Sequence, residues 1–207
     1  MEEQENDIMM GALELFSRYG IRSVTMDDVA RELAVSKKTI YKYFENKADL
    51  IDRCVDVIQG KIQSKIEETH VRKGNPIEEL FEINEIVKDI LEKHNPALRF
   101  QLEKYYPQTA RKLFDERRIL INRIIYENIE RGVDEGWYRK DIAVDIITRL
   151  YCSKLETAED IEVESDLVNK HGIERVMCEG VVYHLRGIVS PKGLEYLEKK
   201  IENLHTV

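Results

Sequence analysis

The sequence lacks the features that mark membrane, secreted or disulfide-linked proteins. No apolar run approaches the roughly 20 residues that span a bilayer, and the opening residues MEEQEND are acidic where a signal peptide would be basic and then apolar. Only three cysteines occur, Cys54, Cys152 and Cys178, and they form no C-x-x-C pair. We therefore expect a cytoplasmic protein without a disulfide framework or a zinc site, in which the cysteines are reduced core residues.

The motifs of the common enzyme classes are also missing. The five histidines never fall in H-E-x-x-H spacing, and the chain contains no P-loop, no G-x-G-x-x-G and no G-x-S-x-G. We therefore predict no catalytic residues, no metal and no cofactor. An enzyme stays the less favoured alternative.

Proline and glycine are scarce, with 4 and 10 in 207 residues, and no alternating run is long enough for a strand. A chain of this length can bury the cores of one or two domains. We predict an all-α fold. An N-terminal three-helix bundle with a helix-turn-helix is expected over residues 1–47, and a larger helical ligand-binding and dimerisation domain over residues 48–207.

Apolar residues at helical spacing divide the chain into successive helices. The expected helices cover 7–19, 25–34, 36–44, 46–74, 77–94, 97–105, 108–135, 142–157, 173–189 and a tail from 191. Residues 155–168 contain six acids and no base, so we expect an exposed connector there.

The segment 18–47 differs in charge from the rest of the chain. It holds seven basic and four acidic residues, although the whole chain has a net charge of −8. Within it, Thr25 and Ser36 are placed to cap two short helices joined by a tight turn, which matches the size of a DNA-binding helix-turn-helix.

The second of these helices has two distinct faces. If Ile40 and Phe44 face the core, Lys38 and Lys42 point almost directly away from it. Cations, hydroxyls and aromatics on such a face suit a major groove and its phosphates. The predicted DNA-binding residues are Thr25, Ser36, Lys37, Lys38, Thr39, Tyr41, Lys42, Tyr43 and Lys47. On charge alone, the three neighbouring lysines could also be an ordinary solvated surface.

Residues 20–50, GIRSVTMDDVARELAVSKKTIYKYFENKADL, resemble the signature of the TetR family of transcriptional regulators. The resemblance implies that Thr25 and Lys47 anchor phosphates and that residues 37–43 form the recognition helix. It also implies a homodimer that pairs through helices near 142–157 and 172–189. Lys38 stands where many members carry Gly, and Tyr43 where His is frequent; both should alter which operator is read.

The sequence therefore predicts a regulator of double-stranded DNA, a repressor by the family's usual mode, that a small-molecule effector releases from a near-palindromic operator. Candidate pocket residues are aromatics on helices of the second domain: Phe100, Tyr105, Tyr106, Phe114, Tyr126 and Tyr151. Aromatics at helical spacing are more often core residues than ligand contacts. A helical adaptor that binds only proteins stays the alternative function, but it would leave the Lys-Tyr face unexplained.

Overall fold

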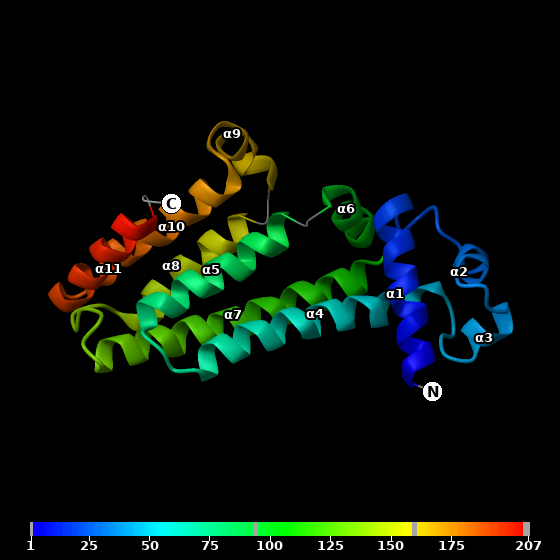
Figure 1. Cartoon of the computed structure of the whole chain (residues 1–207), viewed down its shortest axis with the longest axis horizontal. Helices are drawn as coiled ribbons and strands as arrows, with labels where there is room; N and C mark the ends of the chain where they lie inside the picture. The colour runs from blue at the N-terminus through cyan, green and yellow to red at the C-terminus, as the bar shows by residue number, and fades with distance from the viewer. Residues whose placement is uncertain (1, 93–94, 159–160, 205–207) are drawn as a thin grey trace. The chain divides into compact units, whose positions relative to one another are not determined.

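The computed structural model describes residues 2–92, 95–158 and 161–204, and in these ranges it contains helices and no strand (Figure 1). The helices are α1 (Glu2–Tyr19), α2 (Met26–Glu32), α3 (Lys37–Tyr41), α4 (Lys47–Val71), α5 (Pro76–Glu92), α6 (Pro96–Tyr105), α7 (Pro107–Asp134), α8 (Val144–Ala158), α9 (Ile161–His171), α10 (Ile173–Ile188) and α11 (Pro191–Leu204). One isolated antiparallel bridge pairs Tyr138 with Val189. The all-α prediction is confirmed.

The chain divides into two compact units, which are described separately. The first unit comprises Met1–Ile62 and Asn95–Arg117, and the second comprises Gln63–His94 and Arg118–Val207. Helices α4 and α7 each contribute residues to both units. The predicted division into domains over residues 1–47 and 48–207 stays a prediction.

The first unit is built around one apolar core. Helix α1 ends where Gly20 takes a left-handed conformation (φ 84°), which an L-residue adopts only with strain. The core draws on α1 to α4 and on residues from α6 and the start of α7. Its buried members include Ile8, Ala12, Leu15, Phe16, Ile21, Val24, Val29, Ile40, Phe44, Leu50, Ile51, Cys54, Leu102 and Ala110.

The second unit packs α10 against α5 and buries aliphatic side chains together with two tyrosines. Tyr138 lies directly against α7 at Gly132, where an added Cβ would come within 2.2 Å of the Tyr138 ring. The Tyr138 hydroxyl donates to Asn128 Oδ1 at 3.1 Å. Burial raises the pKa of Tyr138 well above its ordinary value, so this phenol stays protonated as the donor.

Two segments are more helical than their sequence indicated. Helix α1 begins at Glu2 instead of residue 7, because acidic residues in a first turn complement the helix dipole. The connector expected over 155–168 is wrong in large part, since α8 extends to Ala158 and α9 begins at Ile161. Glutamate is a good helix former, so an acidic run without apolar periodicity can still be helical.

None of the described helices is both long enough and apolar enough to cross a bilayer.

Candidate nucleic-acid interface

Helix α2 begins with the capping box that its sequence predicted. The Thr25 hydroxyl oxygen accepts a hydrogen bond from the Asp28 N–H at 3.2 Å, and the Thr25 N–H donates to Asp28 Oδ2 at 2.8 Å. Hydrogen bonds from Thr25, assisted by Arg31, lower the pKa of Asp28. The start of α2 is therefore fixed with an ionised carboxylate in its first turn.

A tight turn then leads into α3. Ala34 has a φ of 52°, in the left-handed region, and the Val35 N–H donates to the Ala30 carbonyl oxygen at 3.0 Å. Ser36 caps α3, because its hydroxyl oxygen accepts from the Thr39 N–H at 3.0 Å. This is the compact helix-turn-helix that the two neighbouring caps predicted.

Helix α3 and the residues after it have the two faces that the sequence indicated. Ile40 and Phe44 are completely buried in the core of the first unit. Lys38, Tyr41 and Lys42 are exposed. A lysine ammonium can donate to guanine O6 or N7 and to phosphates, and a tyrosine hydroxyl can reach a phosphate. The exposed face thus presents groups that can read and hold DNA.

Side chains at the margins of this face have partners within the protein. The Lys37 ammonium lies 2.5 Å from Asp27 Oδ1, and this contact raises the pKa of Lys37. The Tyr43 hydroxyl donates to Gln4 Oε1 at 2.9 Å. The hydroxyls of Ser36 and Thr39 are hydrogen-bonded to each other at 2.8 Å. These contacts orient the margins and leave the centre of the face exposed.

Lys47, at the start of α4, is drawn toward the loop between α1 and α2. Its ammonium donates to the Ile21 carbonyl oxygen at 2.5 Å and lies 3.4 Å from that of Arg22. Burial lowers the pKa of Lys47, and the nearby Asp28 carboxylate opposes that shift. An ammonium has three N–H donors, so Lys47 can hold this loop and still offer a donor to a phosphate oxygen.

The same loop is held from a distant part of the sequence. The Arg22 N–H donates to Gln101 Oε1 at 2.8 Å, and the Arg22 guanidinium donates to the Tyr105 hydroxyl at 3.0 Å. Gln101 and Tyr105 belong to α6, which the sequence had assigned to the larger domain. Sequence reasoning missed these contacts because no local pattern links residues about 80 positions apart.

The six aromatic residues predicted for the ligand pocket are divided between the two units. Phe100, Tyr105, Tyr106 and Phe114 belong to the first unit, with Phe100 and Tyr105 exposed; Tyr126 and Tyr151 belong to the second. Tyr151 is buried and packs against the His184 ring, with centroids 4.4 Å apart. The assignment of these residues to a pocket stays a prediction.

A shallow cavity in the second unit has a volume of about 270 Å³. Residues of α5 and α11 line it: Glu78, Tyr196, Lys199, Lys200 and Asn203. None of the six predicted aromatic residues is among them. In the part of the chain that the structure describes, no group of three or more His, Cys, Asp or Glu residues is arranged to hold a metal ion.

The helix-turn-helix lies in a part of the sequence that matches a known family, and longer stretches resemble two known regulators. Residues 8–54 match the family described as "Bacterial regulatory proteins, tetR family". The HTH-type transcriptional repressor KstR2 of Mycobacterium tuberculosis is 18% identical over 152 residues, 72% of this chain and 76% of that protein. The icaADBC negative transcriptional regulator IcaR of Staphylococcus aureus is 22% identical over 154 residues, 66% of this chain and 83% of that protein.

A solved structure of a TetR/AcrR-family transcriptional regulator from Thermobifida fusca has a similar fold. It superposes with a TM-score of 0.70 at 21% identity, covering 89% of this chain and 98% of that one. The likeness extends beyond the matched N-terminal residues, so the helical architecture of nearly the whole chain is shared.

Proposed function

We propose that this chain is a DNA-binding transcriptional regulator of the TetR family and represses transcription from a near-palindromic operator. The observation that carries the proposal is the outer face of α3, where Lys38, Tyr41 and Lys42 are exposed while Ile40 holds the helix in the core. An adaptor that binds only proteins would give this face no role. Repression is supported by KstR2, described as a repressor, and by IcaR, described as a negative regulator.

Different residues around α3 would contact the bases and the phosphates of the DNA. Lys38 and Lys42 would contact base edges in the major groove, and Tyr41 would reach a phosphate. Thr25 and Lys47, at the starts of α2 and α4, would anchor the flanking phosphates. The full proposed set is Thr25, Ser36, Lys37, Lys38, Thr39, Tyr41, Lys42, Tyr43 and Lys47.

A palindrome requires two copies of the chain, and α8 and α10 offer apolar surface for pairing them. Ile146 and Leu150, one turn apart on α8, are 57% and 63% exposed, and Tyr183 on α10 is 84% exposed. Gly187, one turn after Tyr183, has no neighbouring atom within 4 Å of an added Cβ. Large apolar side chains exposed on a monomer are typical of an association surface. These faces support a homodimer through α8 and α10.

Release from the operator would follow binding of a small-molecule effector to the helices after α4. The two recognition helices of a dimer must lie about one DNA turn apart, roughly 34–36 Å, to read both half-sites. Because α4 follows the recognition helix directly, a shift of α4 would change that separation. The protein would act in the cytoplasm, where its DNA lies, and would perform no catalysis.

Selection of random duplex DNA on the purified protein, at near-physiological salt, tests the proposal. Recovery of a near-palindrome with two half-sites about one helical turn apart is the expected result. Lack of enrichment by protein that has been unfolded and refolded, to remove any bound ligand, would favour the adaptor. Placing the selected sequence upstream of a reporter then distinguishes repression from activation.

A further inference from the structure

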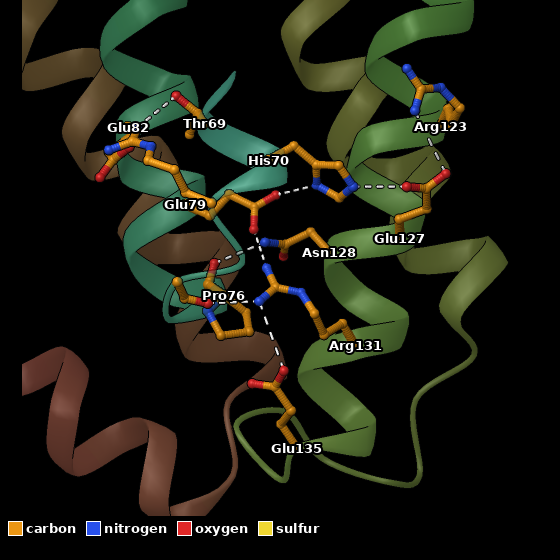
Figure 2. A network of polar contacts seen from close by, with 12 residues as sticks. Thr69, His70, Pro76, Glu79, Glu82, Arg123, Glu127, Asn128, Arg131 and Glu135 are labelled. Atoms are coloured by element: carbon orange, nitrogen blue, oxygen red, sulfur yellow. Dashed lines mark hydrogen bonds and ion pairs between the residues drawn. The ribbon is translucent and has the colours of Figure 1, made fainter. Parts of the chain in front are cut away.

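A network of charged side chains surrounds the last turn of α4, within the second unit (Figure 2). His70 lies at its centre: Nδ1 is 2.7 Å from Glu79 Oε1, and Nε2 is 2.8 Å from Glu127 Oε2. A neutral imidazole has a single N–H, so its other nitrogen would face a carboxylate lone pair. The imidazolium can donate to both carboxylates at once. The geometry is therefore that of a protonated histidine.

The side chain of Glu79 is buried and that of His70 is largely buried, so the charge of His70 affects the stability of this network. The side chain of Glu79 is 2% exposed and that of His70 is 16% exposed, whereas Glu127 is 43% exposed. A buried carboxylate needs cationic partners, and Glu79 has two, His70 and Arg131. If His70 lost its proton, Arg131 would be the one remaining cationic partner of Glu79.

The other charged groups facing His70 come from all three helices. From α7, Arg123 contacts both Glu127 and Glu67 of α4, and Arg131 lies 3.8 Å from Glu135. At the edge of the network, Arg72, the residue after α4, pairs with Glu82 of α5. Histidine is the residue type whose charge depends on pH near neutrality, and the other charged groups of this network are carboxylates and guanidinium groups.

The network ties three helices together. His70 belongs to α4, Glu79 to α5 and Glu127 to α7. Nearby contacts hold the loop between α4 and α5 without depending on the histidine: Arg131 donates to the Gly74 carbonyl oxygen at 2.6 Å, and Asn128 donates to that of Pro76 at 3.0 Å. Loss of the His70 proton thus removes one of the two links that this side chain makes, to α5 or to α7, while the loop stays in place.

We propose that protonated His70 is a positioning residue for DNA binding, which fixes the C-terminal end of α4 against α5 and α7, so that operator affinity falls as this histidine loses its proton. The inference rests on the proposed function. Helix α4 runs without a break from Lys47, next to the recognition helix, to Val71. Holding its far end restricts the orientations that α4 samples, and affinity scales with the fraction of molecules in the competent orientation.

The test is operator affinity at constant salt between about pH 5.5 and 8.5, the range in which histidine titrates. Wild type should lose affinity as pH rises, by at most about a hundredfold per pH unit because a dimer links two protons, one per chain, to operator binding. His70→Gln should bind weakly with a flat profile. His171→Gln, which removes an exposed histidine at the end of α9, should follow wild type.

A second variant tests the same inference if His70→Gln fails to fold. Glu127 is half exposed, so Glu127→Gln should fold; it removes one acceptor of the imidazolium and should move the loss of affinity to lower pH. A profile that His70→Gln or Glu127→Gln leaves unchanged overturns the inference while the proposed function stands. Wild-type protein that binds no DNA at any pH overturns the proposed function and this inference with it.

Discussion

Replacing Lys47 by Met should affect stability and DNA binding in separable ways. Methionine keeps much of the aliphatic stem but removes the ammonium that bonds the Ile21 carbonyl oxygen at 2.5 Å. A hydrogen bond from a charged group contributes about 1.5–3 kcal/mol, and partial exposure of Lys47 places the expected loss at about 1–2 kcal/mol. Urea unfolding, followed by circular dichroism, measures this loss.

The same variant also tests the phosphate contact. If each Lys47 of a dimer neutralises one phosphate, the slope of log affinity against log salt should fall in magnitude by about 1.8. Lys65→Met, which removes an exposed cation farther along α4, should change neither stability nor slope. Unchanged stability in Lys47→Met would refute a stabilising role of the Lys47 ammonium at the α1–α2 loop. An unchanged slope would refute the phosphate contact.

Three further outcomes follow from packing. Gly132→Ala should destabilise the protein by about 1–3 kcal/mol in thermal unfolding, because its Cβ would meet the Tyr138 ring. Gly60→Ala, with open space around it in α4, should stabilise the protein by up to about 1 kcal/mol. Equal effects of the two substitutions would contradict this packing. Burial raises the pKa of Cys54 to about 12, so the thiol should resist alkylation at pH 8 until urea unfolds the first unit, and labelling as fast as in the unfolded chain would show that the core opens. Tyr183→Glu should dissociate the dimer in sedimentation experiments while the monomer stays folded, and a dimer of undiminished stability would exclude this face of α10 from the interface.

The sequence predicted those parts of the fold that depend on neighbouring residues. Thr25 and Ser36 mark helix starts because their side chains bond N–H groups three residues away. Ile40 and Phe44 indicate a buried face because residues four apart lie on one side of a helix. Such short-range rules were sufficient to predict the helix-turn-helix and its exposed lysines.

Contacts between distant residues lay outside the reach of these rules. Gln101 bonds the backbone of Arg22 across 79 positions, and His70 meets Glu127 across 57. Nothing in either local sequence favours the pairing, since it arises only when whole helices pack. For the same reason the sequence did not indicate that α6 joins the compact unit of the DNA-binding helices.

If the exposed face of α3 recognises the operator, Lys42→Ala should weaken and blur that recognition. Fluorescence anisotropy with the selected operator, and with the operator mutated in one half-site, measures both affinity and sequence preference. We expect Lys42→Ala to lose about 1–3 kcal/mol of binding free energy per base contact and to discriminate less between the two DNAs, while Lys65→Ala behaves as wild type. Wild-type affinity and discrimination in Lys42→Ala would contradict the assignment of α3 as the recognition helix.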